Sequence, residues 1–346
     1  MSRSKSRIFY KIKYRIRLII PSSIWEDMSK IVAQKKEHEF KEIEVSYGTL
    51  NSESKIFIIR RRPPGAGLFS NVNLVMQGLV RAKEIGAIPI VDFENYWMDE
   101  YATTRPINGS KNSWDQFFKP VSNLTLDEAY SSKNVILSAG QRILGEGLFS
   151  SKSYQWIFNE EMFQLIAQNA SNILKLNDSL ENELNEYKKQ HNIDEINILG
   201  VSVRGGNYEK YQYSKHAKQP SVNLIEKEID YVINKYKVDK IYVQTHDYDK
   251  FEKIKNNYGD IILPNIALEK YQTYEQWKKQ SPKDRPKHWD NSPKQNIFDN
   301  QNYAKEIFLL SSCSYFVGGI SGGSAYAKVL NNGKYIYQHI FNIGED

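Results

Sequence analysis

The second half of the chain alternates short apolar runs, rich in β-branched residues, with segments whose apolar residues recur every three or four positions. The first pattern is typical of buried strands and the second of amphipathic helices. The predicted strands are 196–203, 239–245, 260–263, 314–317 and 334–338, and the predicted helices are 221–237, 249–258, 302–312 and 323–331. This alternation predicts an α/β domain with a parallel, doubly wound sheet that binds ligands at the carboxyl ends of its strands.

The first half contains a smaller α/β pattern. Strands are predicted at 43–45, 55–60 and 88–93, and an amphipathic helix around 72–82 lies between the second and the third. A strand, a helix and a second strand in this order form a βαβ unit. Residues 102–160 are rich in loops, with one short strand at 134–138, and we assign no chemistry to them.

A chain of 346 residues, of which 40% are hydrophobic, is long enough to bury two cores. We therefore expect a basic arm at 1–45, an N-terminal α/β domain at 46–190 and a C-terminal Rossmann-like domain at 191–346. Two charged helices at 161–176 and 180–191 are expected to link the two domains.

The net charge of +6 is concentrated in the arm, whose first twenty residues contain seven Lys and Arg and no acid. Without these seven, 40 basic residues are balanced by 41 acidic ones, so we expect no nucleic-acid-binding face on the folded part. The arm interleaves its cations with Ile, Tyr, Phe and Leu, which suits an anionic membrane surface or, alternatively, a sheet edge. Its longest apolar run, 18–20, is too short for a signal peptide or a membrane-spanning helix.

The single cysteine, Cys313, excludes a disulfide within the chain and favours a reducing compartment. Because it lies in the apolar run LLSSCSYFVGG, we expect a small core residue and not a nucleophile. These features favour a cytoplasmic location, peripheral on the inner face of the cytoplasmic membrane if the arm binds lipid.

Glycine and polar residues follow three predicted strands of the second half. Arg204, Gly205 and Gly206 follow the first, Thr245, His246 and Asp247 follow the second, and the turn 318–324 leads from a later strand into a helix. Glycines let backbone N–H groups approach a ligand, and a helix N-terminus favours phosphate. Each of the three is by itself compatible with a plain turn; together they predict an anion site at one edge of the sheet.

The loop before the first predicted helix contains Gly65, Ala66 and Gly67, which either offer backbone N–H groups to a polar ligand or form a tight turn. It matches a dinucleotide fingerprint poorly, because Ser70 takes the place of the third glycine. An NAD-dependent oxidoreductase is disfavoured, because no ribose-binding acid is convincingly placed after this loop and because it leaves the second half of the chain unexplained.

Asp92 and Glu94 lie at the end of the strand 88–93, close to Tyr96 and Trp97. Aromatic rings stack on sugar faces, and a carboxylate can take the proton of a sugar hydroxyl. The alternative is a pair of solvated loop acids.

With these motifs assembled, the sequence resembles the GDP-fucose-dependent fucosyltransferases of the GT-B fold, a group that includes bacterial α-1,2- and α-1,6-fucosyltransferases, the nodulation-factor enzymes and protein O-fucosyltransferases. The resemblance covers roughly 55–95 and 196–338, and it is carried by GAGLFSNVN, GVSVRGGNY, IYVQTHDYD and NYAKEIFLLSSCSYFVGGISGGSAYAKVL. It implies two Rossmann-like domains with a cleft between them, the N-terminal one for the acceptor and the C-terminal one for the nucleotide sugar.

The resemblance also implies roles: Arg204 binds the donor β-phosphate and stabilises the leaving GDP, Glu306 recognises guanine, and the turn 321–323 holds phosphate. The residues expected to bind the donor are Gly65, Gly67, Ser202, Arg204, Gly205, Gly206, Thr245, His246, Asp247, Glu306, Ser321, Gly322, Gly323 and Ser324. No metal or other cofactor is implied. Asp247 and Asp249 have the spacing of a metal-binding Asp-x-Asp motif, but we interpret Asp249 as a helix N-cap.

The sequence departs from the family pattern at three positions. Ser202 stands where many relatives have His, Gly205 replaces a second arginine, and Asn207 replaces an acid. Arg204 is then expected to carry the phosphate charge largely alone.

We expect a glycosyltransferase, specifically an inverting fucosyltransferase that moves fucose from GDP-fucose to a surface glycan (O-antigen, capsule or lipopolysaccharide) or its lipid-linked precursor, with Glu94 or Asp92 as base. Two alternatives remain open: an enzyme of the same fold that uses another GDP-sugar or nucleotide sugar, and a non-catalytic glycan-binding or assembly protein. The long segment between the predicted strand 260–263 and the helix at 302 is interpreted as a lid, with disorder as the alternative.

Overall fold

The computed structural model describes residues 41–61, 67–96, 106, 109–140, 154–205, 217–245, 247–267 and 293–344. The predictions for the arm up to residue 40, for Gly65, Gly206 and His246, and for most of the expected lid, 268–292, lie outside these residues. The chain divides into two compact units, each of which is described by itself.

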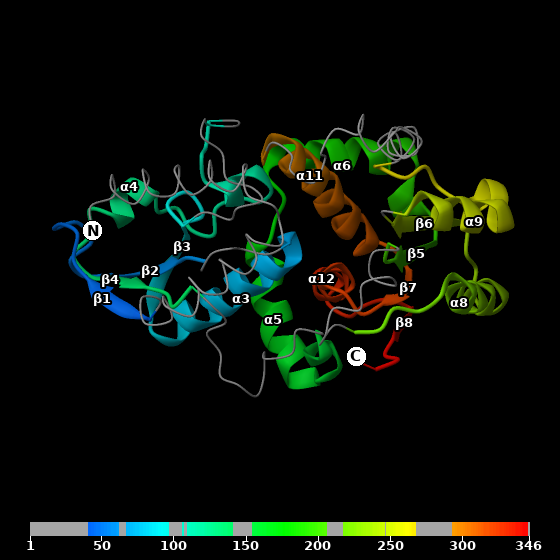
Figure 1. Cartoon of the computed structure of the whole chain (residues 1–346), viewed down its shortest axis with the longest axis horizontal. Helices are drawn as coiled ribbons and strands as arrows, with labels where there is room; N and C mark the ends of the chain where they lie inside the picture. Colours follow the sequence, from blue (N-terminus) through cyan, green and yellow to red (C-terminus); the bar gives the residue numbers. More distant parts are fainter. Residues whose placement is uncertain are drawn as a thin grey trace, which may run out of the picture. The chain divides into compact units, whose positions relative to one another are not determined.

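The first unit is built on a four-stranded sheet of order β1-β4-β2-β3 (Figure 1). The strands are β1 (Ile43–Val45), β2 (Lys55–Ile59), β3 (Ala87–Val91) and β4 (Val135–Leu137). β2 pairs in parallel with both β3 and β4, while β1 pairs antiparallel with β4. The predicted βαβ unit is therefore β2-α3-β3, in which helix α3 spans Leu68–Glu84.

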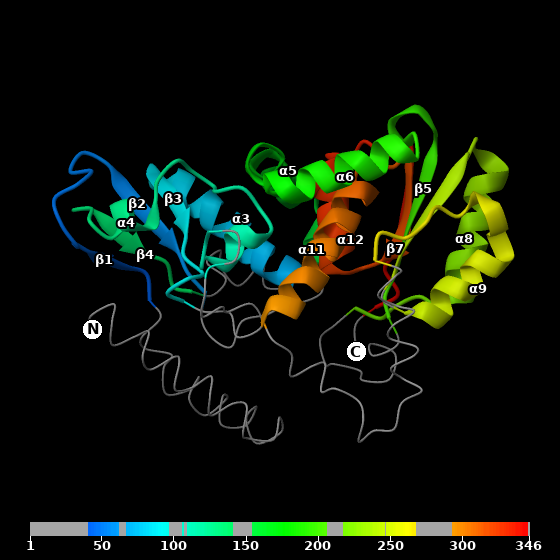
Figure 2. The same ribbon diagram turned by 90° about the horizontal axis from the view of Figure 1, so that it is seen from above.

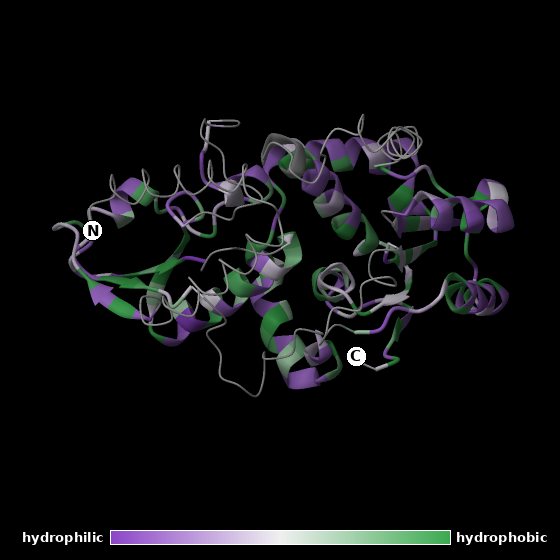
Figure 3. Ribbon diagram, viewed as in Figure 1, coloured by the Kyte–Doolittle hydropathy of each residue, from purple (hydrophilic) through white to green (hydrophobic). Residues whose placement is uncertain are grey.

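Helix α3 covers one face of this sheet. It packs so closely on β2 that a Cβ atom at Gly78 would lie 2.8 Å from the side chain of Ile59. On the opposite face, buried Ile56 and Ile58 cluster with Ala129 of the short helix α4 (Leu126–Ala129). The hydrophobic colouring of β2 in Figure 3 agrees with the burial of Ile56–Ile59 on both faces.

The second unit contains a four-stranded, wholly parallel sheet of order β6-β5-β7-β8. The strands are β5 (Ile198–Val203), β6 (Lys240–Thr245), β7 (Tyr315–Gly319) and β8 (Tyr337–Phe341). The longer helices that accompany it are α5 (Glu160–Ile173), α6 (Asp178–Gln190), α8 (Val222–Lys235), α9 (Tyr248–Tyr258), α11 (Pro293–Leu310) and α12 (Gly322–Asn331). The predicted α/β class, with a Rossmann-like parallel sheet in the C-terminal half, is confirmed.

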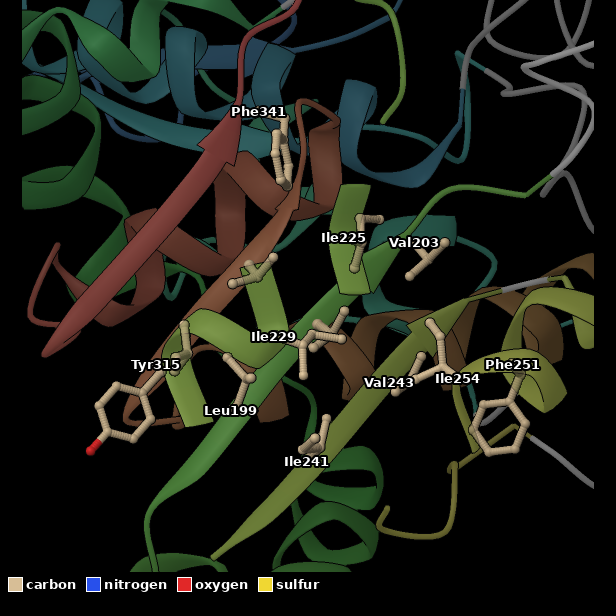
Figure 4. Close-up of a cluster of buried hydrophobic side chains, with 13 residues drawn as sticks. Leu199, Val203, Ile225, Ile229, Ile241, Val243, Phe251, Ile254, Tyr315 and Phe341 are labelled. Carbon is tan, nitrogen blue, oxygen red and sulfur yellow. The ribbon is translucent and has the colours of Figure 1, made fainter. Parts of the chain in front are cut away.

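Alternate residues of β5 face two different layers of helices. Leu199, Val201 and Val203 point toward α8 and α9, where Ile225 and Ile229 complete a buried apolar cluster (Figure 4). The intervening residues face the opposite layer, which contains α6, α11 and α12 (Figure 2). The period of two along a strand therefore separates one apolar face from a second face that carries polar groups.

One predicted strand is absent from the second sheet. Residues 259–261 form the short 3-10 helix η4 (Gly259–Ile261), and only Ile262 makes an isolated parallel bridge, to Ile241. Gly259 ends α9 with a φ of +57°, a conformation that favours glycine. The apolar residues that follow are therefore too few to extend a strand, and the prediction of 260–263 was wrong.

The division into units differs in detail from the expected boundary at 190. Helices α5 and α6, apart from Ile173 at the end of α5, group with the second unit, although we had expected both within 46–190. Residues 173–177 between the two helices group with the first unit. Helix α11 also starts in the first unit and continues in the second from Asp299.

The packing of β5 predicts the effect of a minimal substitution, Gly200→Ala. The added Cβ atom would lie 2.8 Å from Cδ2 of Leu310 and 3.1 Å from Sγ of Cys313, both buried. Overpacking of this kind is expected to lower the free energy of unfolding by about 1–3 kcal/mol. Denaturant unfolding followed by circular dichroism measures this loss.

The control is Gly67→Ala, because a Cβ atom at Gly67 would have no neighbour within 4 Å. Its expected effect is below about 1 kcal/mol, the size of a weakened helix cap. Equal losses for the two variants would contradict the packing argument.

Candidate functional site

The order of the second sheet gives a topological switch point at its carboxyl edge. The chain proceeds from β5 to β6 on one side and later returns to β7 on the other side of β5. Helices that follow neighbouring strands then leave in opposite directions, and such a switch point is where open α/β sheets bind ligands. Because Ser202 is paired with Gly318, Arg204 and Ile320 leave the sheet side by side.

Helix α12 begins at this edge. Ser321 is its N-cap, and the Ser321 hydroxyl accepts a hydrogen bond of 3.0 Å from the N–H of Ser324. Gly322 and Gly323 form the start of the helix, where N–H groups have no acceptor within the helix. The predicted strand, glycine turn and helix N-terminus are thus confirmed as structure, and the positive end of the helix dipole lies at the carboxyl edge of the sheet.

Two glycines of this turn are closely packed against side chains. A Cβ atom at Gly319 would lie 2.4 Å from Oε1 of Gln219, whose Nε2 donates to the carbonyl of Ile320. A Cβ atom at Gly323 would lie 2.4 Å from Oη of Tyr303. These glycines therefore allow the turn to pack closely against Gln219 and Tyr303. The sequence pattern did not indicate this role.

At the ends of β5 and β6, side chains form hydrogen bonds with backbone groups. Arg204 is half-buried, and its carbonyl accepts a hydrogen bond of 3.0 Å from Nζ of Lys250. Thr245 is buried, and its hydroxyl accepts from the N–H of Asp247. Lys250, on α9, was not recognised from the sequence, because a lysine on a helix is normally a solvated residue.

Asp247, and not Asp249, caps helix α9. Its Oδ1 accepts a hydrogen bond of 3.3 Å from the N–H of Lys250, and the helix begins at Tyr248. The prediction of Asp249 as N-cap was therefore wrong by two residues, and Asp249 lies exposed in the first turn. Among the described residues, no three His, Cys, Asp or Glu side chains converge as metal ligands would.

A buried polar network lies beneath the ends of β5 and β6. The Ser202 hydroxyl donates to Oε1 of Gln244 at 2.8 Å. Oε1 of Glu306, on α11, accepts from the hydroxyl of Tyr242 at 3.1 Å and from Nδ2 of Asn265 at 2.9 Å. Ser202 is thus a member of the core, bonded to a neighbouring strand.

Glu306 has no exposed surface, and its Oε2 lacks a hydrogen-bond partner within the described part of the chain. Burial raises the pKa of this carboxyl to about 8, although hydrogen bonds from Asn265 and Tyr242 act in the opposite direction. The resemblance implies a contact between Glu306 and guanine, but the carboxyl is enclosed by protein here. Asn265, which also donates to the carbonyl of Val243 at 2.7 Å, was not recognised from the sequence.

Cys313 is also a core residue, as predicted. It is free and buried, and its side chain lies close to Gly200 of β5. Burial raises the pKa of its thiol to about 12, so the thiolate needed for a nucleophile is disfavoured.

In the first unit, Asp92 holds a turn. Its Oδ1 accepts from the N–H groups of Glu94 and Asn95, and its Oδ2 accepts from Nδ2 of Asn95 and, at 2.6 Å, from the hydroxyl of Tyr130. The carboxylate is fully buried, with four donors around it. This environment argues against Asp92 as a base, because a base must reach the substrate's proton.

Glu94 is half-buried at the carboxyl end of β3, next to an acid that the sequence did not single out. Burial raises the pKa of Asp115, the Ser110 hydroxyl lowers it, and the charge of Glu94 raises it. Asp115 lies in the 3-10 helix η1 (Ser113–Gln116), which is tied to β3 by a hydrogen bond from Asn112 to the carbonyl of Val91. The link between η1 and β3 depends on the polar side chain of Asn112, so a pattern of hydrophobic residues could not predict the position of Asp115.

Comparison with known proteins gives similarity at the level of structure alone. No protein-family model and no curated protein matches the sequence. The chain is similar to the NodZ α-1,6-fucosyltransferase soaked with GDP-fucose, with 13% identity, a TM-score of 0.48, and coverage of 80% of this chain and 93% of that one. The fucosyltransferase NodZ from Bradyrhizobium is 14% identical, with a TM-score of 0.44 and coverage of 80% of this chain and 92% of that one. POFUT1 in complex with GDP-fucose is 10% identical, with a TM-score of 0.34 and coverage of 84% of this chain and 74% of that one.

At sequence identities of 10–14%, the function has to be argued from the chain's own residues. Within the described ranges, no helix combines the length and the apolar character that crossing a membrane requires. The role of the arm at a membrane stays a prediction.

The buried carboxyl of Glu306 predicts that the free energy of unfolding depends on pH, and the substitution Glu306→Gln is expected to remove this dependence. Because the pKa of Glu306 in the fold, about 8, lies above its ordinary value of 4.5, its stabilising contribution is complete below about pH 4.5 and is lost as the pH rises to about 8. Between pH 5 and 8, the wild-type chain is expected to lose on the order of 1 kcal/mol per pH unit relative to the variant. Equilibrium unfolding of both proteins at three pH values measures the difference, and a constant difference would contradict it.

Proposed function

We propose that this protein is a glycosyltransferase that uses a GDP-sugar, specifically GDP-fucose, as donor. One observation carries the proposal: Arg204 leaves the sheet at its switch point, directly beside the N-terminus of α12. A guanidinium and a helix N-terminus at one edge of the sheet suit the phosphates of a nucleotide. The choice of GDP and fucose is supported by the sequence resemblance of 196–338.

The proposed reaction is a direct displacement with inversion. An acceptor hydroxyl oxygen forms a bond to the anomeric carbon of fucose, the bond from that carbon to the β-phosphate oxygen breaks, and GDP leaves with the electron pair. In this proposal, Arg204 and the N-terminus of α12 stabilise the charge that develops on the diphosphate.

Glu94 is the proposed base that receives the acceptor's proton. Its backbone is held by the bond from its N–H to Asp92, and its carboxyl is half-buried. Asp92, the second candidate of the sequence analysis, is fully buried and already accepts four hydrogen bonds. The choice between the two therefore favours Glu94.

The proposed acceptor is a surface glycan or its lipid-linked precursor. The support is the basic, partly apolar sequence of the first twenty residues, which suits an anionic membrane. The proposed location is the inner face of the cytoplasmic membrane. Co-sedimentation of the full chain, but not of a chain lacking residues 1–20, with anionic vesicles tests this arm.

The donor is identified by thermal shift with GDP, GDP-fucose, GDP-mannose and UDP-sugars. A ligand present at 100 times its Kd stabilises the chain by about 2.7 kcal/mol. We expect stabilisation by GDP and GDP-fucose and none by UDP-sugars. Preference for a UDP-sugar would refute the donor, and binding of GDP-fucose without transfer or hydrolysis would favour a non-catalytic binding protein.

Arg204→Ala tests the mechanism. Loss of a charged hydrogen bond to the leaving group is expected to reduce kcat/KM for GDP-fucose by about 100-fold or more, since one preorganised donor is worth about 10²–10³ in rate. The matched control is Arg81→Ala, because Arg81 is on the surface of α3 and pairs with Glu42 and Glu84. Unchanged turnover of Arg204→Ala would rule out the proposed role.

Glu94→Gln tests the base. Removal of a general base is expected to lower kcat by about 10²- to 10⁴-fold while the Kd for GDP-fucose stays the same. Rates of transfer and equilibrium binding are measured on the same preparation. A variant with normal kcat would place the base elsewhere, and Asp115 would be the next candidate.

A further inference from the structure

Lys250 occupies an unusual position for a cation. It lies in the first turn of α9, where its backbone N–H donates to the capping carboxylate of Asp247. A positive side chain in the first turn of a helix opposes the helix dipole, so helix stability alone does not explain a lysine here. The half-buried Nζ of Lys250 donates instead to the carbonyl of Arg204, at 3.0 Å, on the neighbouring strand end.

This contact brings a second cation to the carboxyl edge of the sheet. The bond spans 46 residues of sequence and ties the start of α9 to the end of β5. Gly205, which follows Arg204 directly, supplies no side chain.

The order β6-β5-β7 puts the two helix starts on opposite sides of Arg204. Helix α9 follows β6 and brings Lys250, while α12 follows β7 and brings the N–H groups of Gly322 and Gly323. A diphosphate has two charged groups joined by one bridging oxygen. Positive charge on both sides of a central arginine matches that distribution.

We propose that Lys250 is a second phosphate-binding cation of the donor site, which contacts the diphosphate from the β6 side while the N-terminus of α12 contacts it from the β7 side. This proposal rests on the proposed function, because it requires a nucleoside diphosphate at the carboxyl edge of the sheet. It supplies from α9 the charge that Gly205 does not provide.

Calorimetric titration of the full chain with GDP and with guanosine tests the proposal. Lys250→Gln is expected to raise the Kd for GDP by about 10- to 100-fold, the effect of a lost charged hydrogen bond. The Kd for guanosine is expected to be unchanged, and Lys250→Arg is expected to retain most of the affinity for GDP. Lys253→Gln is the control, because Lys253 lies one turn further along α9 and pairs with Glu226 and Asn223.

A double-mutant cycle separates direct contact from support of Arg204. If Lys250 contacts phosphate, Lys250→Gln also weakens GDP binding when Arg204 is already alanine. If Lys250 merely holds the backbone of Arg204 in place, the second substitution has no further effect, and the proposal is refuted.

The remaining outcomes are distinct. If the wild-type chain binds GDP and the Lys250→Gln variant binds it with equal affinity, this inference is overturned and the proposed function is left intact. Equal weakening for GDP and guanosine shows a structural role and also overturns it. Absence of GDP binding by the wild-type chain overturns the proposed function and this inference together.

Discussion

The pairing of β5 on both of its edges is the constraint on which the candidate site depends. Val203 is bonded in register beside Thr245 of β6, and Ser202 beside Gly318 of β7. A central parallel strand has no free backbone groups and both of its faces are covered, so its polar groups become accessible only where it ends. The position of Arg204, one residue beyond that end, follows directly from this geometry.

The second face of the sheet shows how polar groups are tolerated inside such a domain. Tyr242 and Gln244 alternate with the apolar residues of β6, and both act on the buried carboxyl of Glu306 of α11. Burial outweighs the charge of Lys305 and the hydrogen bonds to Glu306, so its carboxyl is best accommodated as a neutral acid. The same residue types that suggested ligand recognition therefore also serve the interior of the fold.

The sequence predicted those parts of the fold that depend on local periodicity. The alternation of strands and helices after residue 196 identified β5, β6, β7 and β8 together with the turn at Ser321, because each apolar run is bounded by its own glycine or polar residues. The strand expected at 260–263 failed because strand formation needs a partner along several residues, and only Ile262 has one. Local composition carries no information about that partner.

The same limit applies to the site. Asp92 was selected for its place after a strand, but its chemistry is decided by Tyr130, which is 38 residues away. Lys250 was missed because its relation to Arg204 exists only after β5 and β6 have paired. Residue type and spacing thus located the edge of the sheet at which chemistry is expected, while tertiary contacts decide which side chains there remain available.

Helix α11 shows that the two units are interleaved along the chain. Its first residues, up to Phe298, belong to one compact unit and its later residues to the other, and 173–177 group with the first unit although most of α5 and α6 lies in the second. A cut at residue 190 would therefore leave segments of both units on either side of it.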